Sequence, residues 1–269
     1  MKKKFSLPAF LGKFYVSVLL FLMYAPILLL IVFSFTNTKL IGNWDGFSLH
    51  LYSALFKDAE IMEAFKNTFL VAISSAIVST ILGTMGAIGI FYLGKRSKAV
   101  MEGISNIPVI NAEIVTALSL TILFVVCGIT FDFVTLLIGH VVLTIPFVVL
   151  SVRPKLMQMD PNIYEAALDL GASPGKALRT IVIPEIMPGI VSGFIMSITL
   201  SLDDYIITAF TRNTAFQTLS TYVYGVTSKK GTLPPSLRAL TTIITLIALV
   251  ILIIVNINNS GEKKKNEKN

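Results

Sequence analysis

Six apolar runs, each about as long as a membrane-spanning helix, alternate with shorter polar segments along the chain. A helix needs about 20 consecutive apolar residues to cross the hydrocarbon core of a bilayer, and none of the six runs contains Lys or Arg. The pattern therefore predicts an all-α integral membrane protein with six transmembrane helices. The runs cover residues 14–35, 68–93, 104–127, 133–152, 186–210 and 239–257.

The longest mixed segment between two runs, residues 160–184, begins with the pattern of a short amphipathic helix. Asp160 suits the N-cap of that helix and Pro161 suits its first position. Gly171 suits the left-handed position that ends a helix. The apolar positions between them fall three or four residues apart, on one helical face: Ile163, Ala166, Ala167 and Leu170.

A second helix start follows at once in the same segment. Ser173 suits an N-cap and Pro174 the first helical position, and we expect this helix to end before Pro184. Its apolar positions again form a stripe: Pro174, Ala177, Leu178 and Ile181. The segment is too polar for lipid and too apolar on one side for water, so we expect another molecule to cover that side.

Composition and charge support a membrane protein and give it a direction. The chain has 269 residues, 54% hydrophobic and 14% charged, against about 25% charged in a typical soluble domain. Of the 22 Lys and Arg residues, 15 lie in segments on the same side as the N-terminus and 7 on the other side. The positive-inside rule therefore places both termini and the 160–184 loop in the cytoplasm. The net charge of +7 sits at membrane ends and does not indicate a nucleic-acid partner.

Two of the runs carry small residues four positions apart, a spacing that lets helices approach closely. Close packing between helices is the interpretation that we favour for both stripes. The stripes are Ser75, Ser79, Gly83 and Ala87 in the second run, and Gly189, Gly193, Ser197 and Ser201 in the fifth.

The single cysteine, Cys127, lies in an apolar run and is predicted to pack there.

Three carboxyl groups lie inside the runs: Glu113 in the third, and Asp203 and Asp204 in the fifth. A carboxylate inside a span costs at least about 2.5 kcal/mol on insertion scales, so it should face a protected or wet interior. No Lys or Arg in any run can neutralise these groups, which favours a path for a cationic solute. Two alternatives remain: a protonated or hydrogen-bonded carboxyl that ties helices together, and, for the aspartates, solvation at the outer end. We expect Glu113 to share a helix face with Asn106.

The 160–184 segment resembles the EAA loop of bacterial ABC-importer permeases, whose pattern is EAA, three residues, Gly, nine residues, then Ile-x-Leu-Pro. The resemblance implies that this loop docks into a groove of an ATPase subunit and transmits its movement. Without the resemblance, the segment would be an ordinary amphipathic connector between two membrane helices. The matching positions are Glu165, Ala166, Ala167, Gly171, Ile181 and Pro184, and Ile183 stands where the family usually has Leu.

Three further stretches resemble polyamine permeases of the spermidine/putrescine importers: IGNWDGFSLHLYSALF, PVINAEIVTALSL and SLDDYIITAF. The resemblance implies a type I ABC importer fold and makes Asp203, Asp204 and Glu113 candidates to contact a polyamine in transit. It also implies that the chain lies in the cell membrane of a bacterium and has three partners: a cytoplasmic ABC ATPase dimer, a second homologous permease subunit and an extracytoplasmic polyamine-binding protein. Relatives for iron, sulfate or phosphate share the EAA loop, so another solute, such as iron or another cation, stays an alternative cargo.

The apolar runs, the composition and the resemblance together divide the chain into three parts. Residues 1–63 would hold the N-terminal tail, the first transmembrane helix and an outer loop. Residues 64–257 would form the permease core with the coupling loop at 160–184. The Lys-, Glu- and Asn-rich residues 258–269 would be a disordered cytoplasmic tail.

The sequence lacks the spacing that a phosphate-binding loop or a zinc site requires. Only three residues separate Gly171 from Gly175, and Ala177 follows Lys176 where a phosphate-binding loop needs Ser or Thr. We therefore expect no enzyme activity, no ATPase site and no cofactor in this chain, because ATP would be used by the partner subunit. No histidine cluster is spaced for zinc, and His140 is expected to be hydrogen-bonded inside the bundle.

Two rival functions belong to other classes. A secondary transporter would use Glu113 or Asp204 to couple solute movement to protons or sodium ions. A membrane scaffold would transport nothing. Neither needs a docking loop for an ATPase, which makes both less favoured than the importer.

Overall fold

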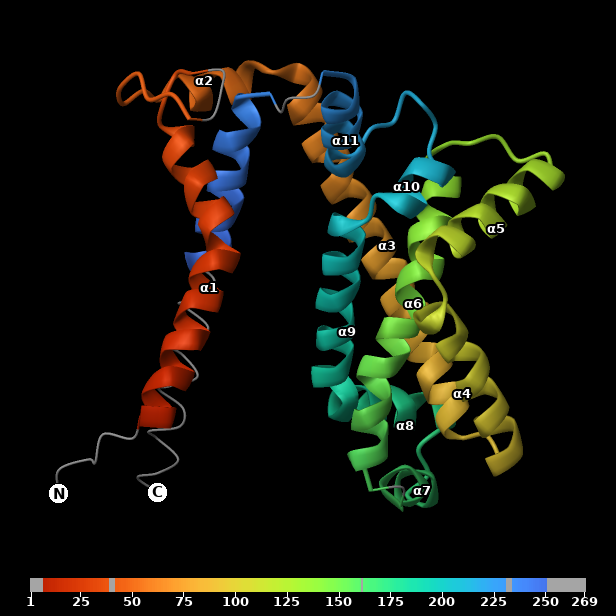
Figure 1. Ribbon diagram of the computed structural model, residues 1–269. Coiled ribbons are helices and arrows are strands. Elements are labelled where there is room, and N and C mark those ends of the chain that lie inside the picture. Colours follow the sequence, from red (N-terminus) through yellow and green to blue (C-terminus); the bar gives the residue numbers. More distant parts are fainter. Residues whose placement is uncertain (1–6, 39–41, 161, 231–233, 251–269) are drawn as a thin grey trace. The chain divides into compact units, whose positions relative to one another are not determined.

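The computed structural model describes residues 7–38, 42–160, 162–230 and 234–250, and within these ranges every regular element is a helix (Figure 1). The chain divides into two compact units, one formed by residues up to Met62 and from Val226 onward, the other by Glu63–Gly225. The helices are α1 (Leu7–Ser34), α2 (His50–Lys57), α3 (Ala59–Phe91), α4 (Lys95–Ile110), α5 (Glu113–Val126), α6 (Phe133–Gln158), α7 (Asn162–Asp169), α8 (Pro174–Ala177), the π-helical turn η1 (Leu178–Val182), α9 (Ile183–Asp203), α10 (Ile206–Thr211), α11 (Leu219–Lys230) and a last helix, Ser236–Val250.

The first unit contains α1, α2 and the last helix. The Arg238 guanidinium at the start of the last helix donates a hydrogen bond of 3.0 Å to the Thr38 carbonyl, just after α1. The ring of Phe35 stacks on Phe47 and packs against Tyr52 of α2, each at 5.5 Å between centroids. These contacts hold the segment after α1 in place. Within this segment α2 buries Leu51 and Leu55.

In the second unit, α3 and α9 meet through the two stripes of small residues. The Ser75 hydroxyl lies 3.2 Å from that of Ser201, and the Ser79 hydroxyl lies 3.4 Å from that of Ser197. All four serines are buried. The predicted close approach of these helices is confirmed, and hydrogen bonds between hydroxyls line the contact.

Helix α6 packs closely against the glycines of the same two stripes. A Cβ atom on Gly83 would lie 2.7 Å from Cβ of Val148, and one on Gly193 would lie 3.2 Å from Cα of Val148. One on Gly189 would lie 3.0 Å from the Ser151 carbonyl oxygen. Val148 of α6 therefore fits between α3 and α9 only because both lack a side chain there. The surrounding core comprises Ala87, Ile90, Val149, Val152, Leu156, Met159, Val182 and Ile186.

The predicted run 104–127 is not one straight helix. It is divided into α4 and α5, which meet at a bend of 102°. Asn111 and Ala112 are extended, with ψ of 144° and 133°, and Pro108 just before them cannot donate a helical hydrogen bond. The Asn111 side chain donates instead to Thr116 of α5, at 3.2 Å. Cys127, predicted to pack, is exposed because it caps the end of α5, where the chain turns.

Four described helices are long and apolar enough to cross a membrane, and the bent pair brings the number to five. The sixth predicted run is described as a helix only over Ser236–Val250. Residues 251–257 of that run and the predicted tail 258–269 lie outside the described residues. The all-helical membrane architecture is thus confirmed for the described ranges, whereas the count of six spans stays a prediction.

Candidate functional sites

The first half of the 160–184 loop folds as its sequence predicts. The Asp160 carboxylate accepts a hydrogen bond of 2.9 Å from the Asn162 backbone N–H at the start of α7. Gly171 has φ of +84°, a left-handed conformation that glycine adopts without strain. Its N–H donates to the Leu168 carbonyl at 2.9 Å, and the Ala172 N–H donates to the Ala167 carbonyl at 3.0 Å. This pair of bonds is the Schellman ending of a helix.

The apolar side of α7 divides into two faces. Ala167 is 6% exposed, and the Tyr164 ring packs on Tyr92 with 5.3 Å between centroids, so this face covers the end of α3. Ile163, Ala166 and Leu170 stay exposed, Leu170 at 89%. The predicted single stripe is therefore wrong for Ala167, which belongs to the inner face. We call Ile163, Ala166 and Leu170 the outer face of α7; the carboxylate of Glu165 is exposed as well.

The second half of the loop does not end before Pro184, contrary to the prediction. From Pro174 to Asp203 the chain is one helical stretch of 30 residues, in which α8 passes through the π-helical turn η1 into α9. Pro184 has no N–H to donate to the carbonyl four residues earlier, and the wider π turn just before it accommodates that loss. Ile181 is half-buried and Pro184 is exposed. The loop therefore continues into α9 without a break.

Asp204 lies at a break between α9 and α10 and is buried, with its side chain 1% exposed. Its Oδ1 accepts from the Ile207 N–H at 3.1 Å. Its Oδ2 accepts from both the N–H and the hydroxyl of Thr208 at 2.8 Å. Sequence reasoning missed Thr208 and the break itself, although an aspartate four residues before a threonine is a pattern that can cap a helix.

His140 of α6 lies beside this carboxylate and is fully buried. Its Nδ1 is 2.7 Å from the Ser201 hydroxyl, its Nε2 is 2.9 Å from the Thr208 hydroxyl, and the same Nε2 is 3.6 Å from Asp204 Oδ2. The prediction that His140 is hydrogen-bonded inside the bundle is confirmed. For Asp204 the geometry matches the alternative in which a carboxyl group ties helices together.

The other two acidic groups are exposed at helix ends. Asp203 is the last residue of α9, and Glu113 is the first residue of α5. The 102° bend separates Glu113 from α4, so the expected common face with Asn106 is wrong. Two carboxylates thus stand free of the packed core, next to the two breaks in the predicted runs.

An open groove runs between α6 and α9 on one side of their contact. Its walls are mostly apolar, and three hydroxyl groups interrupt them, from Ser151, Ser192 and Thr199. A groove of this composition would suit a chain of methylene groups carrying hydrogen-bond donors. It lies on α6, which carries His140, and on α9, whose end is followed by Asp204.

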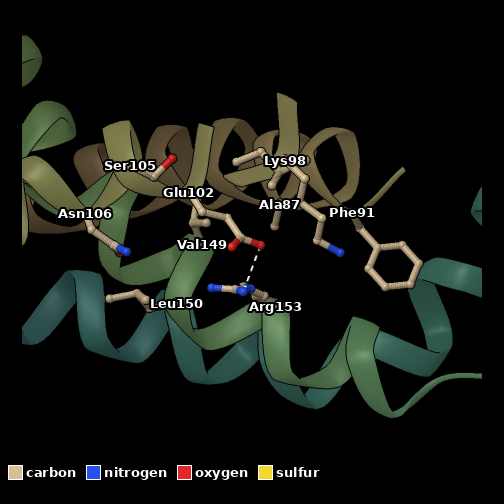
Figure 2. A pocket seen from close by; sticks show the side chains of 10 residues that line it. Ala87, Phe91, Lys98, Glu102, Ser105, Asn106, Val149, Leu150 and Arg153 are labelled. Atoms are coloured by element: carbon tan, nitrogen blue, oxygen red, sulfur yellow. Dashed lines mark ion pairs between the residues drawn. The ribbon is translucent and has the colours of Figure 1, made fainter. Parts of the chain in front are cut away.

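A second pocket lies where α3, α4 and α6 meet, and Figure 2 shows Glu102 and Arg153 pointing toward each other within it. The Arg153 Nη2 and Glu102 Oε1 atoms are 2.7 Å apart. The Lys98 ammonium lies 4.9 Å from the centre of the Phe91 ring, within the range of a cation–π interaction. Because no residue of α4 is buried, burial contributes little to holding this helix, and the ion pair is a specific contact that joins α4 to α6.

Replacing Glu102 by glutamine is expected to lower the free energy of unfolding by about 0.5 kcal/mol. The effect is small because the side chains of Arg153 and Glu102 are 33% and 21% exposed, and such pairs contribute little in water. Thermal unfolding of the purified protein checks this, with the exposed Glu63→Gln as control. A double-mutant cycle with Arg153→Gln should return a coupling of the same size, and zero coupling would contradict the tie.

Comparison with known proteins places these features in a family. Residues 79–260 match the model of the family described as "Binding-protein-dependent transport system inner membrane component". The matched region includes the last part of α3, from residue 79 onward, and all of α4 to α11, and hence the loop, the α9–α10 break and the groove.

Two curated relatives and one solved structure resemble the chain over most of its length. The spermidine/putrescine transport system permease protein PotC of Escherichia coli K12 is 34% identical over 222 residues, covering 82% of this chain and 83% of PotC. The putrescine transport system permease protein PotI of the same strain is 33% identical over 229 residues, covering 82% and 81%. A crystal structure of a bacterial ABC transporter involved in the import of the acidic polysaccharide alginate superposes with a TM-score of 0.70 at 12% identity, covering 96% of this chain and 99% of that one. At that identity the likeness concerns the fold alone.

Proposed function

Because the chain belongs to the family of binding-protein-dependent transport system inner membrane components, we propose that it forms part of the membrane path of an ATP-driven importer of the polyamines spermidine and putrescine. Polyamines are proposed as the cargo because the two relatives at 34% and 33% identity are both named for polyamine transport. The family match alone supports a permease in the inner membrane of a bacterium rather than an enzyme.

The chemistry of the chain supports a cationic cargo. Asp203 and Glu113 are exposed carboxylates next to breaks in apolar runs that contain no Lys or Arg. A polyamine is a chain of methylene groups that carries ammonium groups, so it would match a largely apolar groove with hydroxyl groups and a carboxylate near one end. We propose Asp203 and Glu113 as groups that contact the cation, and Asp204 as part of the same path from inside the core.

The 160–184 loop would couple the path to ATP hydrolysis in a partner. We propose that the outer face of α7 docks on a cytoplasmic ABC ATPase, with two ATPase copies serving two homologous permeases. The Schellman ending would hold α7 at a fixed angle to α8, and the continuous helix from Pro174 to Asp203 would carry the movement into the membrane. The residues proposed for this coupling are Glu165, Ala166, Ala167, Gly171, Ile181 and Pro184.

The remaining partners follow from the same proposal. A second homologous permease would complete the path, and an extracytoplasmic polyamine-binding protein would deliver the cargo to its outer end. Both chain termini would lie in the cytoplasm, as the distribution of Lys and Arg predicts. ATP binding would open the path outward, and hydrolysis would return it inward.

Uptake of labelled spermidine and putrescine tests the function directly. A strain that lacks this chain should lose ATP-dependent uptake of at least one of them, and the wild-type gene should restore it. Asp203→Asn should lower the initial rate about tenfold, which corresponds to about 1.4 kcal/mol, because a charge partner of the ammonium group is lost. Glu60→Gln, an exposed carboxylate in the first turn of α3, should leave the rate unchanged. Full uptake by the deletion strain would reject the polyamine assignment.

A further inference from the structure

The break between α9 and α10 interrupts a stretch that its hydropathy predicts to be one helix, and a buried chain of polar groups crosses it. The chain begins at the Ser75 hydroxyl on α3, which lies 3.2 Å from the Ser201 hydroxyl on α9. This chain of hydrogen bonds continues from Ser201 through the imidazole of His140 to the hydroxyl of Thr208 on α10, and it ends at the carboxylate of Asp204. Five buried side chains thus connect four helices.

The directions of these hydrogen bonds follow from the carboxylate, which can only accept. The Thr208 hydroxyl therefore donates its proton to Asp204 Oδ2, at 2.8 Å. Because that proton is used, the Thr208 oxygen accepts from His140 Nε2, at 2.9 Å. In the neutral imidazole, Nδ1 is then the acceptor for the Ser201 hydroxyl, at 2.7 Å. One neutral tautomer of His140, protonated at Nε2, satisfies every bond.

This arrangement gives the two neighbouring aspartates different environments. Asp204 turns inward, where its carboxylate accepts from Ile207 and Thr208 and its backbone carbonyl accepts 2.7 Å from the Ser220 hydroxyl. Asp203 stays exposed at the carboxyl end of α9. A helix leaves its last four carbonyls without N–H partners and carries a partial negative charge there. The break therefore presents an exposed carboxylate on a negatively polarised helix end.

We propose that His140 is a positioning residue of the cation path: by joining Ser201 of α9 to Thr208 of α10 it holds the break in the shape that keeps Asp203 exposed to the passing ammonium group. His140 does not touch the cargo. The proposal rests on the proposed function, because it assigns His140 a role in cation transport beyond holding helices together. It predicts that loss of the chain of hydrogen bonds impairs transport through Asp203.

The test uses the complete transporter, with both permeases, the ATPase and the binding protein reconstituted in vesicles. Thr208→Val keeps the shape of the side chain and removes the hydroxyl, whereas Thr208→Ser keeps the hydroxyl and is the matched control. We expect Thr208→Val to lower spermidine uptake per ATP hydrolysed about tenfold, with assembly and ATPase activity within twofold of wild type. Thr208→Ser should transport like wild type. His140→Leu should behave like Thr208→Val, and if it fails to assemble, the Thr208 pair still decides.

A second measurement separates positioning from a purely structural role. If the hydrogen-bonded chain acts through Asp203, adding Thr208→Val to Asp203→Asn should cause no further loss of uptake, since effects that share one cause are not additive. Additive losses, unchanged uptake in Thr208→Val, or a parallel fall of assembly, ATPase activity and uptake would each overturn the proposal. A wild-type complex that hydrolyses ATP but carries no polyamine would reject the proposed function itself, and the proposal with it.

Discussion

Replacing Gly171 by valine is expected to lower ATP-driven uptake at least about tenfold, while the protein still inserts into the membrane and assembles. The φ of +84° at this position disfavours every residue with a Cβ atom, and a β-branched side chain most of all, at roughly 1–3 kcal/mol. A Cβ atom here would meet nothing within 4 Å. The strain is therefore confined to the backbone, and its relief would change the angle between α7 and α8.

The measurement compares spermidine uptake with ATPase activity in the reconstituted transporter. Gly175→Val is the matched control, since it adds the same side chain in the same loop. At Gly175 φ is not positive, and an added Cβ atom would meet nothing within 4 Å. We expect the control to retain most of its uptake and Gly171→Val to hydrolyse ATP without transport. Normal uptake in Gly171→Val would reject the docking role of the loop.

Replacing Gly83 by valine is expected to have the largest effect on stability. Its Cβ atom would lie 2.7 Å from Cβ and 2.8 Å from Cγ1 of Val148, closer than packed atoms tolerate, so α3 and α6 would have to move apart. Overpacking of this kind destabilises by about 1–3 kcal/mol or more. The amount of folded protein in the membrane and its thermal midpoint in detergent should both fall.

The neighbouring Gly89 provides the control, because a Cβ atom there meets nothing within 4 Å. Gly89→Val should leave the thermal midpoint nearly unchanged. Adding Val148→Ala to Gly83→Val should recover part of the loss, since it removes the atoms that clash. Equal midpoints for the Gly83 and Gly89 variants would contradict the close contact of α3 with α6.

Local sequence patterns predicted the features that depend on neighbouring residues. The start and the glycine end of α7 follow from Asp160 and Gly171, and the close packing along α3 and α9 follows from small residues four positions apart. In both cases the deciding residues lie within one helix or one turn. The amphipathic pattern of the loop already indicated a covering molecule, and the family resemblance added the expectation that this molecule is an ATPase.

The two breaks in the predicted runs could not be found in the same way. Hydropathy measures how apolar a segment is, but a break inside such a segment depends on where the freed N–H groups find acceptors. At the α9–α10 break those acceptors are the oxygens of Asp204, and the anchor is His140, which is 61 residues away from Ser201 in the sequence. The contacts of Asp204 are local, but only the folded arrangement brings His140 to the break. Pro184 shows the opposite case: a local rule predicts an end, and a π turn allows the helix to continue.

The uninterrupted helix from Pro174 to Asp203 has a mechanical consequence. At a rise of about 1.5 Å per residue, its 30 residues form a rod about 45 Å long. Near its middle, Gly189 and Gly193 lie so close to the backbone of α6 that a Cβ atom would not fit without a shift. Such a close contact can act as a pivot. Under the proposed function, a helix held at this point would pivot there, so a movement of the loop end in one direction would move Asp203 at the other end in the opposite direction. A push on the loop would therefore close the membrane path at one end as it opens it at the other.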